Sequence, residues 1–444
     1  MDSQTSRMQA EMQRYMLRRR SVLKGGIAGA AALAAPGLMR SASAKPAEPM
    51  QFIGWQYQPE IVAENVGIFS KLYDENVNYE LVPGEYHAVA ETKLIGGQHV
   101  DMMYSEEDRL IRWNTAGWSR SLEGLPGIEE IKAGMYPINV HNMSLADGSL
   151  GGLPYYTGFN SFVCNQKHLD AAKLEPPATW PEFLDQCRKL KKDKIAEYPY
   201  ISAWGRQWAS LSWSLFSIWY SEGAKVFDDK FQPAFGQEFR DVLEMHKTIY
   251  AEGLIPPDVM TQLGESVPNF ATGQHTYMVV HEYDQKVFNT PSMSQIAGAC
   301  RNAIMPGKTR STFIWTAVYQ MGANPIDVDR VWNLMQFFGG KAKDGKYHVI
   351  ERWALEFGLG TPYKEVINSP QVVESFSKWK DMKISAQQQE TATTRDVAKT
   401  IWFPEWDWYM MGEVQDYIQG KQSTDELVDK LQAKFTELKQ QYPD

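Results

Sequence analysis

Two short segments contain the carboxylates that glycoside hydrolysis would need. The segment FPEWDWY supplies Glu405 and Asp407, and the segment YSEED supplies Glu106, Glu107 and Asp108. Cleavage of a glycosidic bond requires two carboxyl groups that flank it, one of them with a raised pKa so that it can donate a proton. Acidic residues in loops are usually solvated, and nothing in the sequence indicates a raised pKa. A carbohydrate-active enzyme with such a pair is therefore the alternative hypothesis, and we expect no catalytic residue and no enzyme.

The other chemical motifs are incomplete. The eight histidines include no pair with the spacing of a zinc-binding helix, and no His/Cys cluster indicates a metal site. The segment MPGKT resembles half of a phosphate-binding loop, but Asn302 stands where such a loop requires glycine. We therefore expect no metal and no cofactor, which also counts against a redox protein.

Aromatic residues are the most informative feature of the composition. The chain has 15 Trp, and many of them lie in inferred loops rather than in regular apolar periods. A flat ring can stack on the C–H groups of a sugar or polyol, and an aromatic contact contributes about 0.5–1.5 kcal/mol beyond its buried area. The alternative is a purely structural role, in which most of these rings belong to the hydrophobic core. The segment WFPEWDWY is harder to explain in that way, because its aromatic residues surround a proline and cannot all face inward.

The first residues of the chain predict export. The paired arginines at Arg18 to Arg20 are followed by SVLK, by an uncharged Ala/Gly-rich run over 25–39 and by the small residues that end at Ala44. This order is typical of a cleavable secretory signal over residues 1–44, and the arginines resemble the twin-arginine export signal. A membrane-anchoring helix is the alternative, but the apolar run is too short to span a bilayer. No Cys lies near Ala44, so we expect a periplasmic protein without a lipid anchor.

The net charge excludes two classes of binding partner, and the cysteine count limits the number of disulfides. The formal net charge is −9, and removal of residues 1–44, with their seven Lys/Arg and two Asp/Glu, makes it −14. An acidic chain is repelled by nucleic acid and by anionic lipid, so we expect neither as a partner. Only Cys164, Cys187 and Cys300 are present, which permits at most one disulfide and favours buried, reduced thiols.

The pattern after residue 45 predicts an α/β fold. Short apolar runs at 50–55, 77–82 and 99–104 are typical of buried strands, and the stretches at 58–76 and 86–97 have the period of helices. This alternation predicts a parallel sheet with right-handed crossovers. Ligands of such sheets bind beyond the carboxyl ends of the strands, so 55–57, 83–86 and 104–106 should share one rim.

The length of the chain predicts two lobes. A Gly/Pro-rich segment at 148–158 and the strand end at 281–284 are candidate crossings between them. The amphipathic tail, with Leu427, Leu431, Phe435 and Leu438 on one face, is expected to pack as a helix on the second lobe. The predicted organisation is a signal over 1–44, an N-terminal lobe from 45–154 plus 285–342 and a C-terminal lobe from 155–284 plus 343–444.

Several segments, taken in order, resemble one family. They are KLIGGQHVDMMY, GWSRSLEGL, GLPYYTGFNSFVCNQKHLDAAKLEPPATWPEFLDQCRKL, FATGQHTYMV and VQDYIQGKQSTDELVDKLQ. In order and spacing they are similar to the family 1 extracellular solute-binding proteins, the sugar-binding components of bacterial ABC importers. The chain departs from the family pattern at Cys164, where an aromatic residue is usual, and at Asn165 to Lys167, which replace Tyr-Asn-Lys.

The resemblance implies a two-lobed periplasmic-binding-protein fold of type II, like that of maltose-binding protein, with a ligand cleft between the lobes. It implies a monomer that captures a carbohydrate or polyol, closes over it without a chemical step and docks on the membrane permease of an ABC transporter. On this basis we expect stacking from the aromatic residues Trp55, Tyr57, Tyr104, Tyr155, Trp204, Tyr283, Trp315 and Trp406. We expect polar ligand contacts from Glu85, Ser105, Glu106, His281 and Glu282, although a solvated strand end is an equal alternative for the segment at 281–283.

Overall fold

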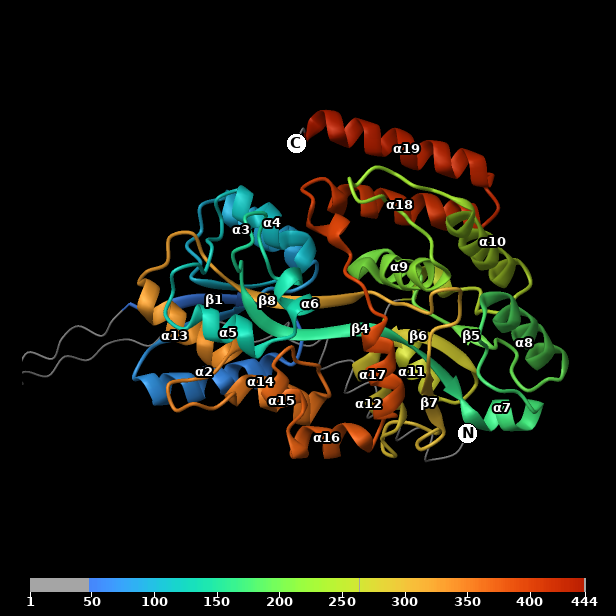
Figure 1. The fold of residues 1–444 in the computed structure, drawn as a ribbon, viewed down its shortest axis with the longest axis horizontal. Coiled ribbons are helices and arrows are strands. Elements are labelled where there is room, and N and C mark those ends of the chain that lie inside the picture. The colour runs from blue at the N-terminus through green and yellow to red at the C-terminus, as the bar shows by residue number, and fades with distance from the viewer. Residues whose placement is uncertain (1–47, 263, 443–444) are drawn as a thin grey trace, which may run out of the picture.

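One sheet runs through the whole molecule. The computed structural model describes residues 48–262 and 264–442, so the predicted signal at 1–44 lies outside the described residues. The strands follow the order β2, β1, β3, β8, β4, β6, β5, with β7 also paired to β4 (Figure 1). Their bounds are β1 Met50–Gly54, β2 Val77–Leu81, β3 Met102–Ser105, β4 Leu153–Asn165, β5 Tyr200–Ile201, β6 Tyr277–His281, β7 Cys300–Ala303 and β8 Ile314–Met321.

Helices cover the sheet in two groups, as Figure 1 shows. The group around β1, β2 and β3 consists of α2 Pro59–Tyr73, α3 Tyr86–Ile95, α4 Glu107–Thr115, α5 Ile128–Gly134, α6 Pro137–Asn142, α13 Val328–Gly339, α14 His348–Arg352, the π-helical η4 Trp353–Phe357, α15 Lys364–Ile367 and α16 Pro370–Ser377. The group around β5, β6 and β7 consists of α7 Gln166–Ala172, α8 Trp180–Lys192, η1 Gln207–Ala209, α9 Ser210–Glu222, α10 Gln237–Ala251, η2 Val259–Thr261, α11 Ser266–Ala271, η3 Glu282–Asp284, α12 Gln285–Phe288, α17 Met382–Glu390, η5 Asp396–Lys399, α18 Phe403–Ile418 and α19 Thr424–Gln441. No helix within 48–262 or 264–442 is long and apolar enough to cross a membrane.

The first strands confirm the predicted parallel sheet. Strand β1 pairs in parallel with both β2 and β3, and helices α2 and α3 connect them. Helix α3 ends at Ile95, directly before the glycines at 96 and 97, and Gly97 adopts a positive φ of 76°. Glycine adopts this conformation without steric cost, which explains why the helix stops there. The carboxyl ends of β1, β2 and β3 therefore meet at one edge.

Two large hydrophobic cores divide the described chain. The N-terminal core contains Phe52, Tyr104 and Tyr155, and the C-terminal core contains Phe162 and Trp315. Residues 153–159 of β4 pair with residues 314–319 of β8, and both strands contribute to both cores. The two lobes are thus joined through one continuous pair of antiparallel strands, seen in the middle of Figure 1.

The cores divide the chain at other positions than the predicted lobe boundaries. Residues 347–379 contribute Ile350 and Phe376 to the N-terminal core, although the sequence placed 343–444 in the other lobe. Val287 and Phe288 belong to the segment 285–342, which the sequence placed in the N-terminal lobe. They pack in a smaller cluster with Val163 on β4. The reason is that β7, which follows them, pairs with the end of β4, so this stretch stays beside the C-terminal core. The movement of the two halves as separate lobes remains a prediction.

The C-terminal helix packs as its periodicity predicts. Ser423 and Glu426 form a reciprocal capping box at the start of α19. The predicted apolar face, from Leu427 to Leu438, is buried. Trp406 on α18 donates its indole N–H to the carbonyl oxygen of Leu431 at 3.2 Å, which connects the last two helices.

The three cysteines are free and buried.

Candidate ligand-binding site

An aromatic group lies at the carboxyl edge of β1 and β3. The ring centroid of Trp55 lies 4.6 Å from that of Tyr104, and Tyr104 stacks on Tyr155 at 4.8 Å. Trp55 follows β1, Tyr104 lies on β3 and Tyr155 lies on β4, so three strands hold this group. Trp55 is partly buried, whereas Tyr104 and Tyr155 are fully buried. The structure therefore brings three of the predicted stacking residues together.

A second aromatic group lies in the C-terminal half. His281, at the end of β6, stacks on Tyr283 at 5.4 Å and lies 4.9 Å from Trp315 on β8. Nδ1 of His281 lies 2.8 Å from the side-chain oxygen of Asn160, which fixes the imidazole ring. Trp213 on α9 packs edge-on against Trp315 at 4.4 Å. Three more predicted residues thus share one site, with Trp213 as an unpredicted neighbour.

Tyr156 connects the two aromatic groups. Its ring lies 5.1 Å from that of Tyr155 and 6.0 Å from that of Tyr283. The β4 to β8 register shifts between Pro154 and Tyr156, and such an irregularity re-aims side chains that would otherwise alternate between faces. Sequence analysis missed Tyr156, although the Gly/Pro-rich segment around it marked the crossing. We call Trp55, Tyr104, Tyr155, Tyr156, Tyr283, His281 and Trp315 the aromatic band.

Tyr57 lies beside this band rather than in it. Its ring lies 6.0 Å from that of Trp353 and 6.3 Å from that of Phe357, both on η4. Trp353 in turn lies edge-on to Tyr155 at 5.6 Å. The segment at 353–357 carries no sequence motif that would assign it to the site, because only the tertiary packing of η4 brings it to the edge of the sheet.

Two predicted stacking residues, Trp204 and Trp406, lie in the C-terminal core outside the aromatic band. Trp204 is fully buried against His246 and Tyr200. Trp406 is fully buried against Phe227 and donates to the backbone of α19. Ring contacts within the core enclose both side chains, and the loop-like sequence around each tryptophan could not reveal these contacts.

The predicted polar residues have different surroundings. Glu85 is an exposed residue directly before α3. Partial desolvation of its carboxyl group raises its pKa. Ser105 is fully buried, with a 3.4 Å contact from its hydroxyl to the carbonyl oxygen of Glu106. Glu282 is buried and pairs with Lys380 at 2.8 Å, and it also accepts a hydrogen bond from Ser385. Glu282 is therefore a partner of α17 and its preceding turn, not an unpaired group that awaits a ligand.

Carboxyl groups gather where α4 meets the C-terminal half. Burial raises the pKa of Glu106 to about 8, with a further contribution from the charge of Asp108, and burial raises that of Glu107 to about 7. Arg395 lies 3.4 Å from Glu107 and partly offsets the burial of that carboxylate. A raised pKa means that the charged form is costly here, because water is excluded and few hydrogen bonds replace it.

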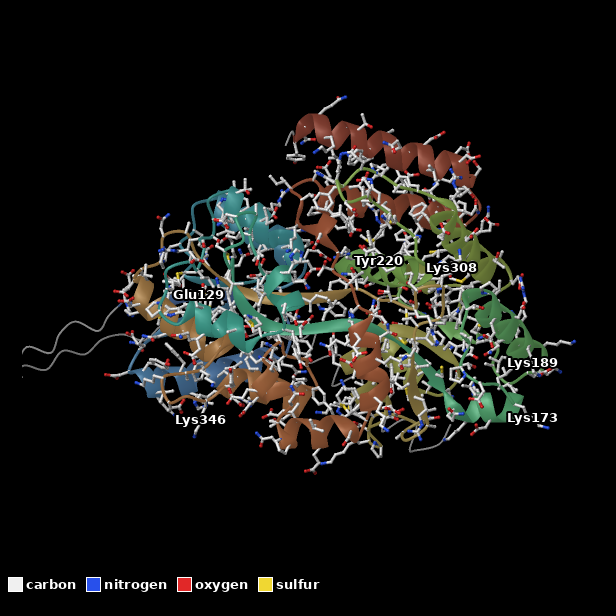
Figure 2. All side chains as sticks on the ribbon, viewed as in Figure 1. Glu129, Lys173, Lys189, Tyr220, Lys308 and Lys346 are labelled. Carbon is white, nitrogen blue, oxygen red and sulfur yellow. The ribbon has the colours of Figure 1, made fainter. Side chains whose placement is uncertain are left out.

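Arg395 has an unusual aromatic environment. Its guanidinium carbon lies 4.8 to 5.7 Å from the ring centroids of Phe313, Phe216, Phe403 and Trp213. Tyr220 of α9, labelled near the middle of the molecule in Figure 2, places its ring 6.5 Å from that of Phe313. Ring faces attract a cation, so the aromatic residues of the C-terminal core help to hold this buried charge.

Further contacts join the two halves around this ion pair. Arg112 on α4 donates to the carbonyl oxygen of Ile401 at 3.3 Å, and His141 on α6 lies 2.8 Å from Asp396. Lys399 donates to the carbonyl oxygen of His141. We call Glu107, Arg112 and His141, together with Arg395, Asp396 and Lys399, the interlobe latch. In this structure the latch connects the two halves, and the aromatic band has members in both cores.

Of the two acidic segments of the alternative hypothesis, the one with Glu405 and Asp407 does not bring its carboxyl groups to one common space. Glu405 is exposed and pairs with Lys434 on α19 at 3.0 Å. Asp407 is buried and accepts a hydrogen bond from Ser212 at 2.5 Å. The two side chains thus have partners on different helices. His87, Glu106 and Asp108, by contrast, bring one ligand atom each within 4.8 Å of one another, a cluster that the sequence prediction of no metal site did not foresee.

Comparison with known proteins identifies the family. Residues 55–326 match the model of the bacterial extracellular solute-binding proteins, which confirms the resemblance seen in the sequence. The chain belongs to this family. No curated protein sequence matches it.

Solved structures share its fold. A maltose-bound MalE3 from T. maritima has a TM-score of 0.75 at 16% identity, over 88% of this chain and 99% of that one. An ABC transporter solute-binding protein from Agrobacterium radiobacter K84 in complex with ribitol has a TM-score of 0.75 at 15% identity, over 87% and 98%. One from Agrobacterium vitis S4 with bound D-mannitol has a TM-score of 0.72 at 17% identity, over 90% and 100%. These likenesses confirm the predicted two-lobed α/β fold.

Proposed function

We propose that this protein captures a carbohydrate or polyol between its lobes and delivers it to the permease of an ABC transporter. The aromatic band is the observation that supports this most directly. Its rings come from both halves of the molecule, so a solute stacked on them contacts both lobes and favours the closed form. Stacking on ring faces suits the C–H surfaces of sugars and polyols.

Capture needs no chemical step. Because Tyr155 and Trp315 are fully buried in the closed arrangement, a solute enters only when the interlobe latch opens. The latch residues are thus the switch between an open form that admits the solute and a closed form that presents it to the permease. The solute shifts this equilibrium by its higher affinity for the closed form.

We infer the setting of this activity from the leader and the charge of the chain. The leader over residues 1–44 directs the chain to the periplasm by the twin-arginine route, and no lipid anchor holds it there. The acidic mature chain works as a monomer, without nucleic acid. The lobes that move are the two cores, joined by β4 and β8 and by the segment between Trp379 and Val397, which belong to different cores.

A ligand screen tests the proposal. Mature protein is titrated, in calorimetry and thermal unfolding, with maltose, ribitol, D-mannitol, sugar acids, an oligosaccharide, an amine and a peptide. A true ligand raises the unfolding midpoint, since ligand at a hundredfold excess over Kd stabilises the fold by about 2.7 kcal/mol. Response to an amine or peptide alone contradicts the carbohydrate assignment. Release of product from a bound glycan favours the carbohydrate-active enzyme instead.

A further inference from the structure

A mixed cluster of nitrogen and oxygen donors lies beside the aromatic band. His87 stands in the first turn of α3, Glu106 directly follows β3, and Asp108 stands in the first turn of α4. The carboxyl ends of β2 and β3 lead into these positions, so the topology of the sheet places them at one edge. Their ligand atoms lie within 4.8 Å of one another.

Two of the donor atoms are enclosed without a partner. Among the residues that the structure describes, Nε2 of His87 and Oδ1 of Asp108 are shielded from solvent and accept or donate no hydrogen bond. The imidazole ring of His87 is fixed by edge-on contacts with Tyr86 at 5.4 Å and Trp113 at 6.1 Å. A buried polar atom without a partner costs about 1–3 kcal/mol, so its retention needs an explanation.

Ion pairs fix the orientation of Asp108 within the cluster. Arg109 pairs with Oδ2 of Asp108 at 2.6 Å, and Glu91 lies 3.5 Å from its Nε and takes up part of its charge. Oδ1 of Asp108 therefore remains open toward His87 and Glu106.

We propose that His87, Glu106 and Asp108 form a binding site for Zn²⁺. One imidazole nitrogen and two carboxylate oxygens are donors that Zn²⁺ accepts, and three protein ligands leave a fourth position open. Glu107, which stands between Glu106 and Asp108 in the chain, lies 3.4 Å from Arg395, so the site borders the contact between the lobes. This site goes beyond solute capture and does not depend on it.

The experiment uses the untagged mature protein, dialysed against EDTA and then freed of it. Calorimetric titration with ZnCl₂ is expected to give one site with a micromolar or lower Kd in the absence of any sugar. Loss of partners that only orient a metal ligand weakens binding by about 10- to 100-fold, so loss of a ligand itself costs at least about tenfold. We expect this loss for His87→Gln and for Asp108→Asn, each checked for folding by circular dichroism.

A matched variant of a surface His–Asp pair distinguishes Zn²⁺ binding at this site from binding at the protein surface. His99 forms another His–Asp pair, 3.0 Å from Asp101, with 47% of its side chain exposed. His99→Gln is expected to bind Zn²⁺ as the wild type does. Absence of one-site binding, or an equal loss in His99→Gln, overturns the proposal. If His87→Gln does not fold, Glu106→Gln and Asp108→Asn decide. Co²⁺ adds a second readout, because His87 ligation gives visible absorption bands that the variants must lose.

The outcome is independent of the sugar screen. Zinc titration is carried out without solute, and the solute screen is carried out in EDTA. A protein that binds sugar but no Zn²⁺ contradicts only the metal site, and one that binds Zn²⁺ but no carbohydrate contradicts only the proposed solute.

Discussion

Nη2 of Arg395 lies 3.4 Å from Oε1 of Glu107, and this ion pair joins the C-terminal half of the molecule to helix α4 of the N-terminal half. Both side chains are about 4% exposed. Removal of one partner of a buried pair leaves the other charge uncompensated, which typically costs 3–5 kcal/mol. The pair therefore couples stability to the arrangement of the two halves in this structure.

Replacement of Arg395 tests this coupling. Arg395→Met keeps most of the side-chain length but leaves Glu107 without its cation, so we expect about 3 kcal/mol less unfolding free energy at pH 7 in urea. Because the latch is weakened, small-angle scattering of the solute-free variant is expected to show a larger radius of gyration than that of the wild type.

Arg330 provides the matched control. It pairs with Glu75 through two nitrogens at 2.7 to 3.0 Å, but both residues belong to the N-terminal half and each is about one-fifth exposed. Arg330→Met is expected to cost about 1 kcal/mol, as for a partly solvated pair, and to leave the radius of gyration unchanged. Equal losses in the two variants contradict a special role for the pair across the lobes.

Tyr156 gives the sharpest test of the aromatic band. Its ring contacts both Tyr155 and Tyr283, so we expect Tyr156→Ala to weaken binding of the best solute by about tenfold, the equivalent of one stacking contact. Tyr156→Phe keeps the ring and should retain affinity within about threefold. Calorimetry measures both variants with the solute from the screen.

Trp408 is the control for this prediction. Trp408 is 49% exposed, and its ring lies 4.2 Å from the guanidinium carbon of Arg206, outside the aromatic band. Trp408→Ala is expected to leave solute affinity unchanged. If Tyr156→Ala binds as the wild type does, or if Trp408→Ala loses as much, the solute does not stack on the band.

The sequence contains the local part of this architecture. Strands β1, β2 and β3 can be predicted because their apolar runs are bounded by polar or Gly-rich turns, and α19 because its apolar residues recur at helical spacing. These signals depend only on which residues lie near one another in the chain. The edge of the sheet, with Trp55 and Tyr104, follows from them directly.

Tertiary packing decides the rest. Trp204 and Trp55 have similar loop-like neighbours in the sequence, yet Trp204 is covered by His246, whereas Trp55 lies on the edge of the sheet. Arg395 reaches Glu107 only because the chain crosses back between Trp379 and Val397. His87 and Asp108 lie on different helices and share no motif, so no spacing rule could group them.

Acid is expected to destabilise the protein through His246. This residue is fully buried, Nδ1 lies 2.7 Å from the carbonyl oxygen of Val242, and burial lowers the pKa to about 4. The unfolded chain binds the proton near pH 6.5, whereas the folded chain does not, so this contribution to stability is complete above pH 6.5 and is lost as the pH falls toward 4. The full loss is on the order of 3 kcal/mol.

Urea unfolding at several pH values between 7 and 4 measures this effect. His246→Gln removes the titrating group, so its unfolding free energy should fall less steeply with pH than that of the wild type, whatever its value at pH 7. Parallel curves for His246→Gln and the wild type contradict the assignment.

Export is expected to depend on the arginines themselves and not on their charge. Replacement of Arg18, Arg19 and Arg20 by lysine preserves the positive charge of the leader, so a pathway that reads only charge and hydrophobicity should tolerate it. A twin-arginine pathway requires the arginine pair, and we expect the unprocessed precursor to accumulate in the cytoplasm of a bacterial host, as detected by cell fractionation. Replacement of Arg7 and Arg14 by lysine removes the same residue type outside the motif and should leave export intact. Unchanged export of the triple variant means that the leader acts as a general secretory signal, and the chain then crosses the membrane before β4 and β8 have joined its two halves.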